Sequence, residues 1–278
     1  MKRPAAIELL SFNPTNIARG PYPCAGFLEV TDAQLGNGDY FGLYWPLGRE
    51  QQNPIICDMM HDEGKLLPVF SCVEKFIEWM RINDWERGET GIKDADFAVS
   101  LFAQAKMLMK SGHLDDAVPV LERACASLPE VSDYWFTLAG QYRRRQQTED
   151  CLRSALFAYR ANWAFGRPAT GIYALLKLAM DHPALADDPI VRRAAILNSQ
   201  FGGVKENTNY DLLLACIKDY FSLGQPLAAL QVYQNYAYAM YFETTAFQQR
   251  YGFELGVWQN EFAALCKQYL GDDRRAMT

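Results

Sequence analysis

The stretch Ser132-Asp-Tyr-Trp-Phe-Thr-Leu-Ala-Gly-Gln-Tyr142 indicates the fold of most of this chain. Its large side chains, Trp135, Leu138 and Tyr142, recur at intervals of three and four residues and therefore share one face of a helix. Beside them stands the small Ala139, which lets a second helix approach closely. The stretch predicts one helix of a closely packed pair.

The same arrangement recurs along the chain with a period of 34 residues. Units that begin at Ala98 and Ser132 are adjacent and in phase, and a further unit begins at Tyr210. Recurrence at a fixed period of this size is typical of helical arrays. We therefore expect an all-α helical-repeat domain over residues 92–278. The alternative is an irregular helical bundle in which the alanine spacing is accidental.

This region resembles a tetratricopeptide array, whose small, small, bulky, small and proline positions are occupied here by Gly112, Ala117, Leu121, Ala124 and Pro129. The resemblance implies a right-handed superhelix with a concave face that binds a partner. The basic residues expected on that face are Lys106, Lys110, Arg143, Arg144 and Lys218. Five cations favour an anionic peptide or a chain terminus as the partner. Alternatively, these charges are only solvated, or the groove accepts the acidic N-terminal domain.

The first 88 residues have a different texture, which predicts an α+β domain. Four short runs are rich in β-branched or aromatic residues, and each is bounded by Gly, Pro, Asn or Asp. These runs cover residues 26–30, 40–45, 54–57 and 66–70. We expect each run to form a strand.

A single helix should follow these strands. Ser71 is its predicted N-cap, because Glu74 stands three residues later and completes a capping box. The apolar residues at 73, 76, 77 and 80 share one face of this helix, which we expect to pack on the strands.

The N-terminal region also resembles the core of the SUKH superfamily over about residues 25–85. The resemblance is carried by Gly36-Asn-Gly-Asp-Tyr-Phe-Gly-Leu-Tyr-Trp-Pro-Leu-Gly48, then Pro54-Ile-Ile-Cys-Asp58, His61-Asp-Glu63 and Val73-Glu-Lys-Phe-Ile-Glu-Trp79. Members share a G-x-G-D-x-x-G strand, a following strand and a helix, but they open with longer helices than this chain has. The resemblance implies a binding domain without catalysis. Bacterial members are mostly immunity proteins that neutralise a toxin, whereas fungal relatives are signalling scaffolds.

The charge of the chain lies mainly in this first region. The chain of 278 residues has 33 acidic and 27 basic residues, a net charge of −6. Residues 1–90 contain 13 acidic and 8 basic residues, a net charge of −5, which leaves −1 for the rest. Such acidity disfavours binding to nucleic acid, because phosphate requires Lys and Arg. A basic protein is the more suitable partner.

These features lead to a bacterial immunity protein as the first functional hypothesis. It would bind a cognate toxin or secreted effector that acts in the cytosol, of the polymorphic toxin or type VI secretion type, and its acidic domain would steer association. The N-terminal residues expected to contact the toxin are Asp39, Tyr40, Tyr44, Trp45, Asp58, His61, Asp62 and Glu63. The alternative hypothesis is a tetratricopeptide adaptor or secretion chaperone that binds a peptide of a larger assembly.

No sequence motif points to an enzyme. Neither GxSxG, a P-loop, HExxH nor paired cysteines occur, and the ligand types near His61 crowd into one turn instead of converging on a metal. We therefore expect no catalytic residue, metal or cofactor. The chain has no transmembrane or signal segment by its hydropathy, which predicts a cytoplasmic protein with its seven cysteines as free thiols. The oligomeric state stays open.

Overall fold

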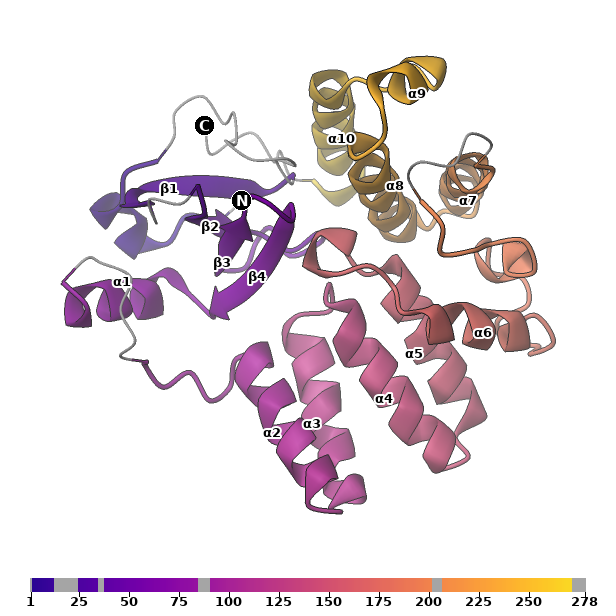
Figure 1. Cartoon of the computed structure of the whole chain (residues 1–278), viewed down its shortest axis with the longest axis horizontal. Coiled ribbons are helices and arrows are strands. Elements are labelled where there is room, and N and C mark those ends of the chain that lie inside the picture. Colours follow the sequence, from indigo (N-terminus) through magenta and orange to yellow (C-terminus); the bar gives the residue numbers. More distant parts are fainter. Residues whose placement is uncertain (1, 13–24, 35–37, 85–90, 202–206, 272–278) are drawn as a thin grey trace. The chain divides into compact units, whose positions relative to one another are not determined.

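The computed structural model describes residues 2–12, 25–34, 38–84, 91–201 and 207–271 (Figure 1). It divides the chain into two compact units, of which the first comprises Met1–Ser100 with Ala263–Thr278 and the second Leu101–Phe262. The predicted fold class is confirmed, because an antiparallel sheet with one helix precedes a mostly helical region. Residues 91–100 and the last residues of the final helix, from Ala263 onward, fall in the first unit.

The first unit is built on a four-stranded antiparallel sheet in the order β1-β2-β3-β4, in which each strand pairs with the next one along the chain (Figure 1). The strands and the helix that follows them are β1 (Phe27–Gln34), β2 (Tyr40–Tyr44), β3 (Ile55–Met60), β4 (Lys65–Phe70) and α1 (Val73–Ile82). Each strand contains or overlaps one of the four predicted runs. A short 3-10 helix, η1 (Ala5–Leu9), precedes the sheet.

The core of this unit lies between α1 and one face of the sheet. The Phe41 ring of β2 lies 5.2 Å from the Phe76 ring and 5.6 Å from the Trp79 ring, both on α1. Trp45 and Ile7 are buried in the same cluster. The predicted apolar face of the helix is confirmed, because residues 73, 76, 77 and 80 are all buried.

The predicted capping box at the start of α1 is wrong. The residue that precedes the helix is Cys72, and its side chain makes no capping hydrogen bond. Ser71 instead binds Asp94, since its N–H donates to Asp94 Oδ2 at 2.8 Å and its hydroxyl to Asp94 Oδ1 at 2.9 Å. Ser71 therefore does not cap α1, because the tertiary structure brings the Asp94 carboxylate within hydrogen-bonding distance of it.

The rest of the described chain is helical. Its elements are α2 (Ala98–Lys110), α3 (Leu114–Ser127), α4 (Ser132–Arg144), α5 (Thr148–Arg160), η2 (Trp163–Phe165), α6 (Thr170–Ala179), η3 (Val191–Arg193), α7 (Asn209–Ser222), α8 (Pro226–Tyr241), α9 (Thr245–Arg250) and α10 (Leu255–Leu270). Helix α10 begins in the second unit, and from Ala263 onward its residues belong to the first. No helix among the described residues combines the length and the apolar character that a membrane span requires.

Two helical hairpins in succession share one phase. Helix α4 begins 34 residues after α2, and α5 begins 34 residues after α3, as the sequence period predicts. The small residues Ala117, Ala124 and Ala139 are fully buried, which lets the helices approach closely. A third hairpin is formed by α7 and α8, whereas α6 is followed by the short η3 in place of a full helix (Figure 1).

Candidate functional site

Four of the residues expected to contact a partner lie in the core of the first unit. Tyr44 and Trp45 are 0% exposed, and Tyr40 and Asp58 are also buried. All five residues of β2 are buried, because this inner strand is covered on both faces. The prediction that these side chains face a partner is therefore corrected. Alternating strand residues reach a surface only where one face of the sheet is open.

The Gly-Asp motif before β2 has a structural role in this fold. Gly38 has φ +95°, in the left-handed region that favours glycine, and its neighbour Asp39 accepts the His61 N–H at 3.0 Å. A Cβ atom on Gly42 would lie 2.1 Å from the Phe27 ring, which covers this position. The two glycines thus allow the His61 ring to lie close to Gly38 and the Phe27 ring to lie close to Gly42. Its first glycine, Gly36, lies outside the described residues.

His61, Asp62 and Glu63 form the accessible part of the predicted acidic surface. The two ring nitrogens of His61 lie 2.8 Å from Asp39 Oδ1 and 2.8 Å from Asp62 Oδ1. The hydrogen bond to Asp39 raises the pKa of His61 above its usual 6.5, and the Asp62 charge acts in the same direction. Asp62 and Glu63 are exposed. No group of three or more potential metal ligands is present among the residues that the structure describes.

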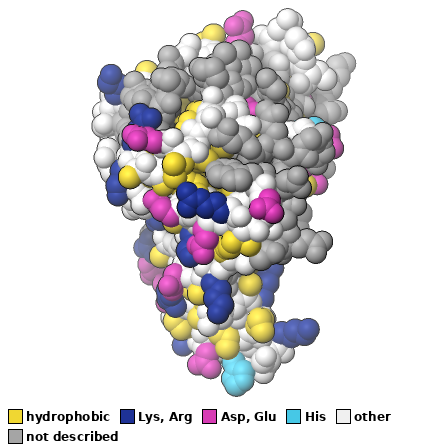
Figure 2. All heavy atoms as spheres, turned by 90° about the vertical axis from the view of Figure 1, so that its left-hand side faces the viewer, with side chains coloured by type: hydrophobic (Ala, Val, Ile, Leu, Met, Phe, Trp, Pro, Cys, Tyr) yellow, Lys and Arg dark blue, Asp and Glu magenta, His cyan; other side chains and the backbone are white. Residues whose placement is uncertain are grey.

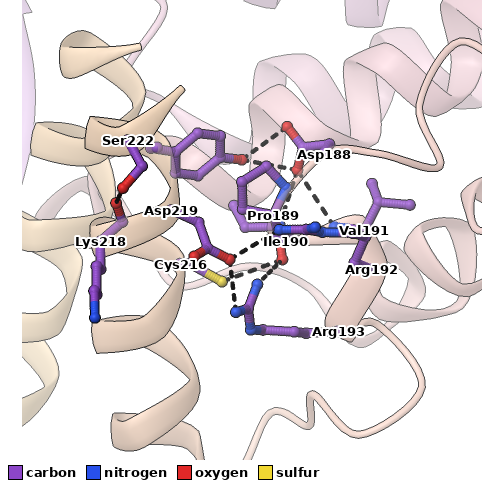
Figure 3. A network of polar contacts seen from close by, with 11 residues as sticks. Asp188, Pro189, Ile190, Val191, Arg192, Arg193, Cys216, Lys218, Asp219 and Ser222 are labelled. Atoms are coloured by element: carbon purple, nitrogen blue, oxygen red, sulfur yellow. Dashed lines mark hydrogen bonds and ion pairs between the residues drawn. The ribbon is translucent and has the colours of Figure 1, made fainter. Parts of the chain in front are cut away.

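The five cations predicted for the helical groove differ in the groups that surround their side chains. Arg144 pairs with Asp115 at 2.6 Å, and Lys106 lies 4.3 Å from the centre of the Phe102 ring. Lys218 points away from the polar contacts at the start of η3 (Figure 3). On the face drawn in Figure 2, Lys and Arg side chains stand beside Asp and Glu side chains and apolar ones. Exposed Lys110 completes the set.

Arg143 is the predicted cation that lines a pocket. This Arg143 pocket has a volume of about 400 Å³ and contains the apolar side chains of Leu152, Leu175 and Leu178. Arg143 forms no ion pair with any described residue. His182 also lines the pocket, and its Nδ1 atom is buried without a hydrogen-bond partner in the described part of the chain. The lining also includes the carboxylate of Asp181, so a ligand with an apolar part and an anionic group placed beside Arg143 suits this pocket.

A second pocket lies between the end of α5, the segment before η3 and the turn between α7 and α8. This Arg160 pocket has a volume of about 420 Å³, and its lining includes Arg153, Leu156, Phe157, Arg160, Asp187 and Asp188. Arg160 is the last residue of α5, and its Nε atom is buried without a hydrogen-bond partner among the described residues.

A polar network joins the segment around η3 to α7 (Figure 3), and two of its residues, Asp188 and Pro189, also line the Arg160 pocket. Asp219 accepts hydrogen bonds from Arg192 at 2.9 Å and from Arg193 at 2.7 Å, and these cations hold its pKa below the usual value. Asp188 accepts the Tyr220 hydroxyl at 2.8 Å and the Ile190 N–H at 2.9 Å. The carboxylates of Asp219 and Asp188 therefore already accept hydrogen bonds from described residues.

The described cysteines agree with the prediction of free, largely buried thiols. All of them are free, and all except Cys72 are buried. Burial raises the pKa of Cys216 to about 12, and its thiol donates to the Pro189 carbonyl at 3.4 Å (Figure 3). A thiol in this environment is a poor nucleophile. Cys24 lies outside the described residues.

The residues of the Arg160 pocket were not predicted from the sequence. Arg160 lies 28 residues before Asp188 and 60 before Tyr220, so no local pattern links them. The available signal was weak, namely an arginine in the last turn of a predicted helix that contains Phe157.

Comparison with known proteins places the whole chain among its relatives. The sequence matches the YfbP N-terminal domain over residues 13–89 and the YfbP C-terminal domain over residues 200–278. It is 48% identical over 266 residues to the uncharacterized protein YfbP of Escherichia coli (strain K12), and the match covers 94% of each chain. The chain therefore belongs to the YfbP family.

Proposed function

We propose that this protein is a non-catalytic binding protein of the cytosol whose helical unit holds an apolar, acidic segment of another protein. The observation that carries the proposal is the Arg143 pocket, in which three leucines form an apolar part of the lining of a space of about 400 Å³, beside an arginine without an ion pair among the described residues. The resemblance of the helical hairpins to tetratricopeptide repeats supports it, because such arrays present grooves for peptides.

The chemistry of the pocket defines the segment that fits. Leu178 is 58% exposed, which is unusual for a large aliphatic side chain unless a partner covers it. An apolar side chain of the partner would bury Leu178, Leu152 and Leu175. A neighbouring carboxylate of the partner would form a paired hydrogen bond with the Arg143 guanidinium.

The test compares two variants of the pocket with one matched control. Arg143→Glu reverses the cation and Leu178→Glu places a charge on the apolar wall, whereas Lys177→Glu reverses an exposed cation outside the pocket lining. Tagged full-length proteins are used to capture partners from cells, and a candidate is then purified and its Kd measured by calorimetry. We expect both pocket variants to weaken binding at least tenfold, which corresponds to about 1.4 kcal/mol, and Lys177→Glu to bind normally. Equal affinity of all four proteins would refute the proposal.

A second candidate is an immunity protein that neutralises a cytosolic toxin. The specific observation in its favour is the exposed pair Asp62 and Glu63 in the acidic region that carries a net charge of −5 over residues 1–90. The resemblance to the SUKH core supports it. Under this proposal the partner is basic, and the acidic edge steers its approach.

Co-expression tests this second candidate directly. Candidate toxin domains taken from neighbouring genes are expressed with the native protein or with the double variant Asp62→Lys and Glu63→Lys. We expect growth with the native protein and loss of protection with the variant. Continued lethality when the native protein is present at equal levels would exclude the immunity role.

A further inference from the structure

Arg160 lines the pocket together with Asp187 and Asp188 but forms no ion pair with either of them or with any other described residue. Its guanidinium lies 5.2 Å from the centre of the Phe157 ring and 5.9 Å from the centre of the Tyr220 ring. Its Nε atom is buried and has no hydrogen-bond acceptor within the described ranges, where the side chain also forms no ion pair. A buried donor of an ionised group normally has a partner. The missing acceptor therefore points to a ligand.

The other charges around this pocket are already balanced or solvated. Arg153 pairs with Glu149 at 2.7 Å. Asp188 is held by Tyr220 and by backbone N–H groups, and Asp187 is exposed to water, where solvent and salt screen its charge. Arg160 is thus the charged side chain of the lining whose buried donor is accepted by no described residue.

We propose that the Arg160 pocket binds a small organic carboxylate, whose carboxylate accepts hydrogen bonds from Arg160 and whose apolar body lies against Phe157 and Leu156. The planar guanidinium matches a carboxylate with two parallel N–H donors. Both aromatic rings hold this fork in place, which reduces the entropy lost on binding. A volume of about 420 Å³ falls within the range of small-molecule sites.

Paired probes test the role of the carboxylate. The probes are 3-phenylpropanoate and 3-phenylpropanamide, which share a carbon skeleton and differ in the charged group that Arg160 would bind. Binding to the full-length protein is measured by calorimetry and by the arginine Nε–Hε signals in NMR spectra. We expect saturable binding of the acid, with a shift of the Arg160 signal, and binding of the amide at least tenfold weaker. No saturable binding of the acid, or equal binding of the two probes, would overturn the proposal.

Four variants locate the site. Arg160→Gln removes the cation and should weaken acid binding at least tenfold, while Arg123→Gln is the matched control because it changes an exposed arginine outside both pocket linings. Arg160→Lys keeps the charge but loses the fork, so it should also weaken binding and keeps the test decisive if Arg160→Gln does not fold. Unchanged affinity of a folded Arg160 variant would contradict the assignment. Weakened binding in Arg143→Gln alone would place the ligand in the Arg143 pocket and would also contradict it.

A peptide probe separates a small molecule from a protein side chain. A blocked tripeptide with a central glutamate presents the same carboxylate on a polypeptide backbone. We expect it to bind more weakly than 3-phenylpropanoate, because its backbone amides would lose water against Phe157 and Leu156. Tighter binding of the tripeptide would refute a small-molecule site.

Discussion

Gly42 is the residue at which a single methyl group should have the largest effect on the sheet. The Phe27 ring of β1 lies directly over it, so the Cβ atom of an alanine would be 2.1 Å from the ring. Both residues are held in paired strands, and the ring is buried. We expect Gly42→Ala to lower the free energy of unfolding by about 1–3 kcal/mol, the usual cost of overpacking a core. Urea denaturation followed by circular dichroism measures this change.

Gly140→Ala is the matched control for this substitution. Gly140 lies within α4, and an added Cβ atom there meets nothing within 4 Å. Alanine in a helix interior is favoured over glycine by about 0.5–1 kcal/mol, so this variant should be more stable than the native protein. Similar effects of the two substitutions would show that the Phe27 contact is unimportant.

His61 should make the stability of the first unit depend on pH. Its pKa is raised above the unfolded value of 6.5, chiefly by the hydrogen bond to Asp39. Protonated His61 therefore stabilises the folded state, fully so below about pH 6.5, and this contribution is lost as the pH rises through the folded-state pKa. We expect the difference in unfolding free energy between the native protein and His61→Gln to shrink from pH 6 to pH 8. A difference that stays constant over this range would contradict the role of the ring.

At the scale of elements, the turn between α4 and α5 contains a strained residue. Gln146 has φ +57°, whereas the corresponding turn between α2 and α3 has Gly112 at φ +83°. The turn between α7 and α8 likewise has Gly224 at φ +67°. A residue with a Cβ atom pays a steric cost in this left-handed conformation, and glycine does not.

Gln146→Gly should therefore stabilise the second unit. We expect the free energy of unfolding to rise by about 0.5–1 kcal/mol, since relief of strain exceeds the added entropy of the unfolded chain. The control is Gln141→Gly within α4, where the same substitution should lower stability by a similar amount. Thermal unfolding of the two variants measures both changes. A shift of the unfolding temperature in the same direction in both variants would show that backbone strain at Gln146 is not the cause.

Most elements could be predicted from the sequence because their signals are local. The four β-rich runs became β1 to β4, and the periodic positions gave the starts of α2 and α4. The capping box failed because Asp94, 23 residues away, binds Ser71. The spacing of residues near Ser71 contains no information about a hydrogen-bond partner so far away in the sequence.

At the scale of the whole molecule, Asn235 connects two distant parts of the second unit. From α8, its amide donates to the carbonyls of Arg160 at 3.2 Å and Ala161 at 2.8 Å, and its oxygen accepts the Trp163 N–H at 3.0 Å. These groups stand at the end of α5, where helical carbonyls lack partners within the helix. A buried side chain some 70 residues away thus completes the hydrogen bonding of the helix end.

Asn235→Ala should destabilise the second unit strongly. It leaves two carbonyls and one N–H buried without these partners, so we expect a loss of about 2–4 kcal/mol in the free energy of unfolding. Gln231→Ala, one turn earlier on α8, should change stability by less than about 0.5 kcal/mol. Denaturant unfolding compares the two variants. Equal decreases in the free energy of unfolding would show that the hydrogen bonds of the Asn235 amide do not stabilise the second unit.

The sequence by itself determined the fold class, the strand runs and the 34-residue phase of the helices, because periodicity and turn residues act over short separations. Only the tertiary structure decided that Tyr44, Trp45 and Asp58 are buried, because their exposure depends on what covers each face of the sheet. It also decided that Arg160 lies beside Phe157 and Tyr220 with its Nε donor buried and unaccepted by any described residue. Charge pairing and burial join residues that are far apart in the chain, and no local pattern records them.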